Sequence, residues 1–133
     1  MTEPDARSWT LPPMTGTRMT SNDRFHWAKR AKITREWRDM ACQHARAARI
    51  PRLDRAHIAI HWLPQNAHAR DAANLYPLGK AAVDGICLDA GVLADDDSTH
   101  LVGPDMRLGE RFRPAVPARG LATLRVTVTE LPA

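Results

Sequence analysis

The sequence contains no long apolar run. No stretch of 18 apolar residues occurs, so a membrane-spanning helix is not expected. The first residues, MTEPDARSWTLPP, lack both the basic and the apolar segment of a secretory signal. The sequence also has no internal repeat and no low-complexity segment. Because the 133 residues are 44% apolar and 26% charged, as in ordinary globular proteins, we expect one domain over residues 1–133.

Cysteine is scarce as well. Cys42 and Cys87 lie far apart in the sequence, and neither belongs to a CxxC pair. A disulfide framework or a thiolate metal site is therefore not indicated. We expect two reduced, partly buried thiols in a cytoplasmic protein.

Lysine is rare, and arginine supplies 16 of the 19 basic residues. Arginine is the side chain best suited to forked contacts with phosphate. Residues 1–70 have 13 basic and 6 acidic side chains, a net charge of +7, whereas residues 71–133 have 6 and 9, a net charge of −3. This asymmetry suits a protein that binds a polyanion and keeps carboxylates for a metal. A high genomic GC content is the alternative source of the arginines.

The first third of the chain predicts a strand, a loop and a long helix. Residues 8–12 (SWTLP) indicate a short strand ended by prolines, and residues 14–21 a polar loop. Ser21 or Asn22 is expected to cap a helix that runs to about Ala48. One face of this helix is apolar, with side chains spaced by four, four and three residues: Trp37, Ala41, Ala45 and Ala48.

The arginines of this helix lie mostly off its apolar face. Arg30 and Arg38 are candidate contacts to DNA phosphates, as is Arg70 further along the chain. A solvated helix surface is the alternative interpretation of the two helical arginines.

Residues 55–63 (RAHIAIHWL) alternate as a half-buried strand does. The larger apolar side chains are expected on one face: Ile58, Ile60 and Trp62. His57 and His61 fall on the other face, about 13 Å apart by strand rise, which is too far to share a metal. We expect both histidines to be ordinary sheet-face residues.

A second helix is predicted from Pro77, which fits a first helical turn, to Gly91, a natural C-terminal cap. Gly79 and Gly85 inside it would allow close approach of a sheet or of a second subunit.

Two strands are predicted near the end of the chain, at residues 106–114 (MRLGERFRP) and 121–131 (LATLRVTVTEL). In the second, alternation places Leu124, Val126 and Val128 on one face. The predicted fold is α/β, with a small mixed sheet packed with two main helices in the order β-α-β-α-β-β.

Carboxylates are the unusual chemical feature. Asp71 lies at a strand-to-helix junction, and Asp95, Asp96 and Asp97 follow that helix. Clustered carboxylates without thiols favour a hard cation, Mg²⁺ or Mn²⁺, which suits phosphodiester hydrolysis. Lys80, one or two turns into the helix, could neutralise the scissile phosphate or help the nucleophile or leaving group.

Two alternatives apply to the acidic segment DDDSTH. It could be a solvated acidic loop, which is the usual fate of such a run. It could also be a calcium loop, but the EF-hand spacing fails: counted from Asp95, His100 replaces the required Gly and Met106 the bidentate Glu.

The segment 70–97 resembles the signature of RusA-type Holliday junction resolvases, small endonucleases of bacterial and prophage origin. The matching residues are Asp71, Asn74-Leu75, Lys80-Ala81-Ala82, Asp84, Gly91-Val92-Leu93 and Asp95-Asp96. The resemblance extends to LPP near the start, the long first helix and the closing LRVTVTEL, and so covers most of the chain.

The resemblance implies a RusA-like homodimer that binds branched DNA (four-way junctions) and makes paired, symmetric nicks with Mg²⁺, in recombination and repair. It implies that Asp71 and Asp96 bind the metal, with Asp95 beside them, and that Lys80 is catalytic. Asn74 and Asp84 match positions of supporting, structural character. The implied location is the cytoplasm of a bacterial or phage-infected cell.

One position departs from the family pattern. The second metal-binding aspartate, two residues after the first, is Ala73 here, and three additional residues separate Asn74 from Lys80. Either Asp95, Asp97, Asn74 or water covers the loss, or the protein binds junctions without cutting them efficiently.

Overall fold

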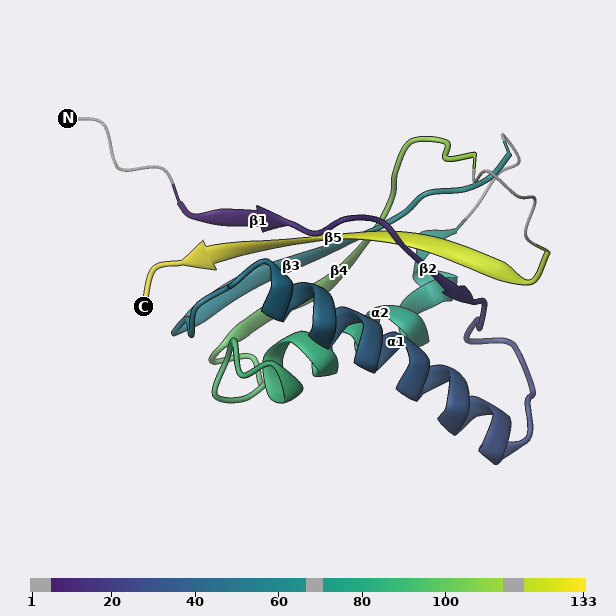
Figure 1. The fold of residues 1–133 in the computed structure, drawn as a ribbon, viewed down its shortest axis with the longest axis horizontal. Coiled ribbons are helices and arrows are strands. Elements are labelled where there is room, and N and C mark those ends of the chain that lie inside the picture. The colour runs from purple at the N-terminus through teal and green to yellow at the C-terminus, as the bar shows by residue number, and fades with distance from the viewer. Residues whose placement is uncertain (1–5, 67–70, 114–118) are drawn as a thin grey trace.

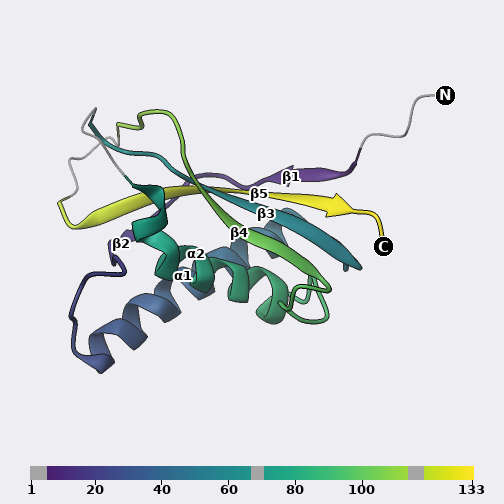
Figure 2. The ribbon, with the colours of Figure 1, turned by 180° about the vertical axis from the view of Figure 1, so that it is seen from behind.

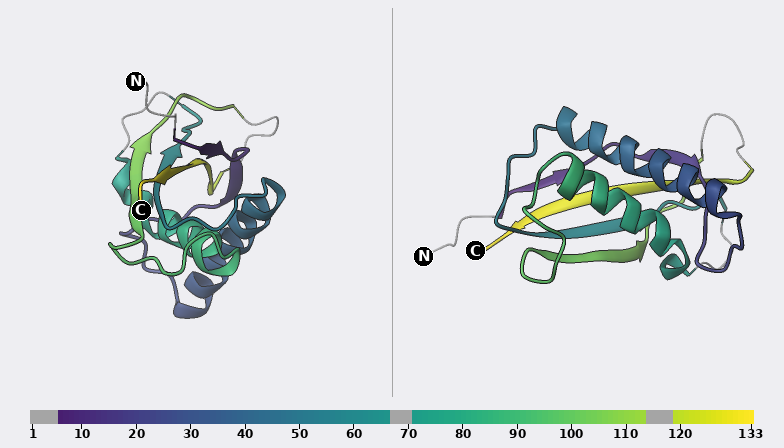
Figure 3. Two further views of the ribbon diagram at one scale, coloured as in Figure 1. Left: turned by 90° about the vertical axis from the view of Figure 1, so that its left-hand side faces the viewer. Right: turned by 90° about the horizontal axis from the view of Figure 1, so that it is seen from below.

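The computed structural model describes residues 6–66, 71–113 and 119–133. The strands form one mixed sheet, and both main helices cover the same face of it (Figure 1; Figure 3, left). The expected α/β class, with a small mixed sheet and two main helices, is confirmed. The elements, in chain order, are β1 (Ser8–Thr10), β2 (Met14–Thr17), α1 (Trp27–Ala47), β3 (Arg55–Trp62), η1 (a 3₁₀-helix, Ala72–Leu75), α2 (Tyr76–Asp84), η2 (a π-helical segment, Gly85–Asp89), β4 (Leu101–Leu108) and β5 (Leu121–Leu131).

The strand order is β1-β5-β3-β4, with β2 also paired to β5. β3 runs antiparallel to β5 and parallel to β4. The parallel pair is connected through α2, which therefore crosses over the sheet beside α1 (Figure 2; Figure 3, right).

The prediction of a polar loop at residues 14–21 was wrong for its first four residues, which form β2. Met14–Thr17 pairs with β5, and Met14 is 1% exposed. A Cβ atom at Gly16 would lie 2.7 Å from a Glu36 carboxylate oxygen and 3.1 Å from the Trp37 ring, so the strand packs closely against α1 there. The predicted order therefore lacked one strand. The side chains of MTGT alternate between buried and exposed only because the segment pairs with β5 and packs against α1.

β4 also lies earlier than the predicted strand at residues 106–114. Gly103 and Pro104 concealed it, because both residues usually interrupt strands. Here they form an irregularity in the pairing with β3, and Gly103 has a φ of +132°. A Cβ atom at Gly103 would approach the Ile58 carbonyl oxygen to 2.6 Å, so glycine is required.

The start of α1 is later than predicted. His26, rather than Ser21 or Asn22, is the N-cap, and its Nδ1 accepts a hydrogen bond from the Ala28 N–H at 3.3 Å. The preceding residues form a turn in which the Asp23 carboxylate accepts from the Thr20 N–H at 2.8 Å. The predicted apolar face is confirmed, since Trp37, Ala41 and Ala45 are all buried, with Ala48 partly buried against them.

The core lies between the helices and the sheet. β3 and β5 point alternate side chains toward the helices, as predicted: Ile58, Ile60, Trp62, Leu124, Val126 and Val128. The other face of the sheet is polar, and His57 lies there with its Nε2 3.0 Å from an Asp105 carboxylate oxygen. His61 also lies on this face, and burial lowers its pKa.

Pro77 stands in the first turn of α2, as predicted, and Gly91 ends the helical segment with a φ of +73°. A Cβ atom at Gly85 would overlap the backbone carbonyl of Arg38, so this glycine allows α1 to pack closely against the end of α2. Gly79 likewise leaves room for the Met106 side chain of β4 against α2. None of the helices in the described part of the chain combines the length and apolar character needed to span a membrane.

Both cysteines are buried free thiols, as expected. Burial, with the nearby charges of Asp96 and Asp84, raises the pKa of Cys87 to about 12. This thiol therefore stays protonated at neutral pH.

Candidate functional site

Lys80 is the centre of the acidic site. Its Nζ donates to Asp84 Oδ1 at 2.9 Å, one helical turn further along α2. It also donates to Asp96 Oδ2, in the loop that follows η2. The carboxylates of Asp84 and Asp96 therefore share one cation, and α2 is connected to the acidic loop through it.

The two carboxylates keep Lys80 charged although its side chain is partly buried. Burial alone would lower the pKa of Lys80, but the hydrogen bonds to Asp96 and Asp84 outweigh it and raise the pKa to about 12. The hydrogen bond from Lys80 lowers the pKa of Asp96. At neutral pH the lysine is a permanent cation and not a general base.

The three consecutive aspartates have different roles. Asp95 accepts a hydrogen bond from the Asp96 N–H at 2.7 Å, which turns the chain just before the buried contact. Asp97 accepts from the Thr99 N–H at 3.0 Å and pairs with His100 at 2.7 Å. Asp95 and Asp97 are exposed and shape the loop, whereas Asp96 reaches Lys80.

Asp71 has a different role from Asp96, at the start of η1. It is the N-cap of η1, and its carboxylate accepts from the Ala73 N–H at 3.1 Å. Among the described residues, no hydrogen bond or ion pair joins Asp71 to Lys80, Asp84 or Asp96. In this structure Asp71 thus serves as the N-cap of η1, and Lys80 pairs with Asp84 and Asp96.

Asn74 supports the backbone near Asp71. Its N–H donates to the Asp71 carbonyl oxygen at 3.0 Å, and its own carbonyl oxygen accepts from the Ser21 N–H at 2.9 Å. Ala73 is exposed on η1, beside the Asp71 carboxylate that its N–H contacts.

Asp84 has a larger role than its motif position suggested. It shares Lys80 with Asp96 and is half-buried. The spacing of four residues between Lys80 and Asp84 was visible in the sequence, and such pairs on a helix normally face each other. The contact of both residues with Asp96 was not visible, because it depends on the path of the loop.

The candidate DNA contacts on α1 have protein partners. Arg38 makes a two-pronged contact with Asp89, at 2.6 and 2.8 Å, which holds α1 against η2. This pair raises the pKa of Arg38 and lowers that of Asp89. Arg30 donates to the Asp23 carbonyl oxygen at 3.1 Å. Arg70 lies outside the described residues.

The chemistry of Asp84 and Asp96 fits a magnesium ion. Both are hard oxygen donors, both already contact one cation, and Mg²⁺ commonly takes only one or two protein carboxylates. Within residues 6–66, 71–113 and 119–133, no group of three or more His, Cys, Asp or Glu side chains is placed to hold a metal. Asp84 and Asp96 would thus suit a two-carboxylate site completed by substrate oxygens, and the metal set of Asp71, Asp95 and Asp96 that the resemblance implies stays a prediction.

Comparison of the chain with protein-family models and with curated proteins finds no match to either.

Proposed function

We propose that this protein is a Mg²⁺-dependent, structure-selective endonuclease that resolves four-way DNA junctions by paired, symmetric nicks, as the RusA-type resemblance implies. The observation that carries the proposal is the contact of Lys80 with both Asp84 and Asp96 at the surface of α2. A cation held between two carboxylates is an arrangement suited to phosphodiester chemistry, in which negative charge develops on phosphate oxygens.

Each residue of the group has a defined part in this proposal. Lys80 remains protonated, because its pKa is about 12, and stabilises negative charge on the phosphate or the leaving oxygen. Asp84 and Asp96 orient Lys80 and would hold the metal ion. Mg²⁺, when bound, supplies a Lewis acid and the charge needed to bring a phosphate to two carboxylates.

The arginine-rich first half supports DNA as the substrate. Arg35 on α1 and Arg49 just after it are exposed, as phosphate contacts require. Arg38 is less available, because it is paired with Asp89.

Paired nicks require two active sites related by two-fold symmetry, and one chain of this size supplies one. We therefore propose a homodimer. Light scattering at micromolar concentration, with and without DNA, tests it, and a monomer under both conditions would contradict it.

A junction-binding protein that cuts weakly is the second candidate. Ala73 replaces the family aspartate, and Asp71 is occupied as the N-cap of η1 and is not joined to Lys80. These two observations favour binding with reduced metal affinity.

A gel assay separates the two candidates. A labelled four-way junction and a linear duplex of the same sequence are incubated with the protein, with and without Mg²⁺. Symmetric nicks in the junction alone, dependent on Mg²⁺, support the nuclease. A junction that is shifted but uncut at every metal concentration supports the binding protein. Equal affinity for the junction and the linear duplex would contradict both candidates.

A further inference from the structure

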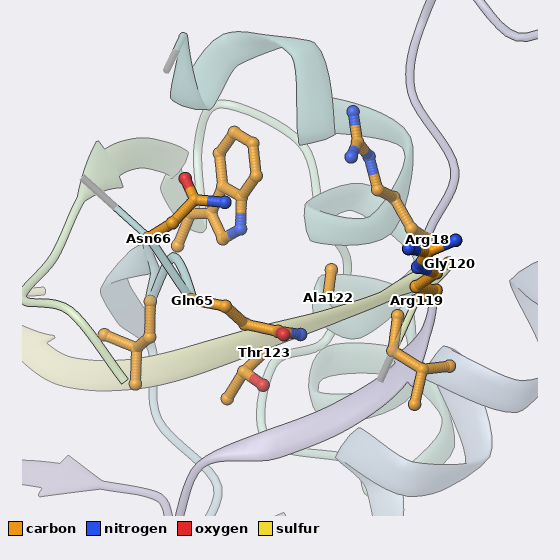
Figure 4. Close-up of a pocket in the computed structure, with 10 residues that line it drawn as sticks. Arg18, Gln65, Asn66, Arg119, Gly120, Ala122 and Thr123 are labelled. Carbon is orange, nitrogen blue, oxygen red and sulfur yellow. The ribbon is translucent and has the colours of Figure 1, made fainter. Parts of the chain in front are cut away.

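A polar cavity of about 300 Å³ lies apart from the Lys80 group, where β3 ends and β5 begins. Arg18, Arg119 and Trp62 line it, together with the amides of Gln65 and Asn66 (Figure 4). Ligand sites in proteins occupy roughly 300–1,000 Å³. The cavity is therefore large enough for one small polar unit and too small for a duplex.

The two arginines come from neighbouring backbone segments. The Arg18 N–H donates to the Gly120 carbonyl oxygen at 2.9 Å, so Arg18 lies beside the turn that contains Arg119. Gly120 has a φ of +74°, which this turn needs and which glycine adopts without strain. The Arg18 guanidinium also lies 5.9 Å from the centre of the buried Trp62 ring, a cation–π contact that limits its motion.

The cavity is strongly basic. Neither Arg18 nor Arg119 has a carboxylate partner in the part of the chain that the structure describes, and none of the residues lining the cavity is acidic. Other arginines differ: Arg7, Arg38, Arg107 and Arg125 each pair with an acidic side chain. Two guanidinium groups on one cavity, one of them held by Trp62 and neither paired with a carboxylate in the described residues, are suited to an oxyanion such as phosphate.

The cavity is connected to the start of η1. Three residues after Arg18, the Ser21 N–H donates to the Asn74 carbonyl oxygen at 2.9 Å, and Asn74 in turn contacts the Asp71 backbone. The segment that supplies Arg18 is therefore held against the start of η1.

We propose that this cavity binds one backbone phosphate of a single DNA strand, with Arg18 and Arg119 as the donors to its oxygens. Gln65 and Asn66 line the cavity beside the two arginines. The site rests on the proposed function in one respect, the choice of DNA over a free nucleotide as the source of the phosphate. It gives a branched substrate a place for a strand that leaves the duplex.

Calorimetric titration without metal tests the site, using a single-stranded tetranucleotide, a nucleoside 5′-monophosphate, inorganic phosphate and an unphosphorylated nucleoside. The tetranucleotide should bind most tightly and the nucleoside not at all. Arg18→Gln and Arg119→Gln should each weaken tetranucleotide binding by about ten-fold or more, as expected for loss of a hydrogen bond to a charged group. Arg52→Gln, an exposed arginine in the loop before β3, is the matched control and should not weaken it.

Several results would overturn the proposal. These are absence of tetranucleotide binding, binding by both variants equal to that of Arg52→Gln, or tighter binding of the monophosphate than of the strand. Arg119→Gln lies in an exposed turn, so it remains informative if Arg18→Gln unfolds by losing its contact with Trp62. Because no metal is present and no cleavage is measured, failure of the proposed nuclease activity would leave this result readable.

Discussion

Lys80 and Asp96 form an ion pair across 16 positions of sequence. One residue lies within a helix and the other in an acidic loop, and their contact makes the loop part of the helix surface. Asp96 is therefore held by tertiary structure, whereas the side chains of Asp95 and Asp97 accept hydrogen bonds from the backbone of the same loop.

Lys80→Met should abolish most cleavage while leaving junction binding nearly intact. The substitution removes the cation that the proposed mechanism places at the phosphate, and loss of such a group typically costs about 10²–10³ in rate. Single-turnover cleavage rates and junction affinities measured together test this. Lys32→Met, at an exposed position of α1, is the control and should leave the rate unchanged. An equal loss of affinity and rate in Lys80→Met would indicate a folding role.

The contribution of the Lys80–Asp96 pair to stability should depend on pH in a defined way. The pKa of Asp96 is below its ordinary value of 3.8, so its contribution is present above about pH 4 and is lost as the pH falls through the lowered pKa. The pKa of Lys80 is raised from 10.5 to about 12, so its contribution is complete below pH 10.5 and is lost as the pH rises through 12.

Asp96→Asn should therefore lower the melting temperature by a few degrees at pH 7, and by less and less as the pH falls below 3.8. Thermal unfolding by circular dichroism over this pH range measures the difference. A difference that persists unchanged at pH 3 would show that Asp96 stabilises the loop by some means other than its charge.

Two arginines of α1 should separate stability from DNA binding. Arg38→Ala breaks the two-pronged contact with Asp89, a partly exposed pair, and should destabilise the protein by about 1 kcal/mol. Arg35→Ala removes an exposed side chain with no ion-pair partner among the described residues, so stability should not change. Its junction affinity should fall instead, with a shallower salt dependence by about one unit of log–log slope. Urea unfolding and binding titrations at several salt concentrations test both substitutions. A loss of stability in Arg35→Ala and not in Arg38→Ala would contradict the assigned role of the Arg38–Asp89 pair.

Ala73→Asp tests the position at which the chain departs from the RusA-type pattern. The new carboxylate would lie on the exposed side of η1, next to Asp71, whose oxygen contacts the residue 73 N–H. Because Asp71 and residue 73 have no hydrogen bond or ion pair to Lys80, Asp84 or Asp96 among the described residues, the Mg²⁺ concentration for half-maximal cleavage should stay unchanged, with little change in junction affinity. A several-fold lower Mg²⁺ requirement would show instead that position 73 faces the metal.

Mn²⁺ should partly rescue the rate of the unsubstituted protein. Ala47→Asp, exposed on α1, controls for the added charge. A slower rate in Ala73→Asp would mean that like charges crowd an already complete site, and no change would mean that position 73 does not face the metal.

Local sequence determined the elements whose residues carry their own periodicity. β3 and β5 were predicted because their side chains alternate strictly, and each buries one face. The buried stripe of α1 followed from Trp37, Ala41 and Ala45. Pro77 and Gly91 bounded the second helical segment, because each has a backbone preference that operates without neighbours.

Elements that depend on partners were predicted poorly. MTGT became β2 only because β5 supplies its hydrogen bonds and Trp37 covers Gly16. β4 tolerates Gly103 and Pro104 because β3 pairs with the residues on either side of them. The free energy of strand pairing comes from residues far away in the sequence, so the local sequence of β2 or β4 does not predict it.

The candidate sites divide in the same way. The sequence by itself singled out Lys80 and the aspartates Asp71, Asp95, Asp96 and Asp97, because residue type and spacing are local properties, and the resemblance added Asp84 as a supporting residue. Only the tertiary structure decided that Lys80 meets both Asp84 and Asp96, that Asp71 caps η1, and that Arg38 pairs with Asp89. It alone placed Arg18 and Arg119 in one cavity, a hundred residues apart in the chain, because the pairing of β2 with β5 brings their segments together.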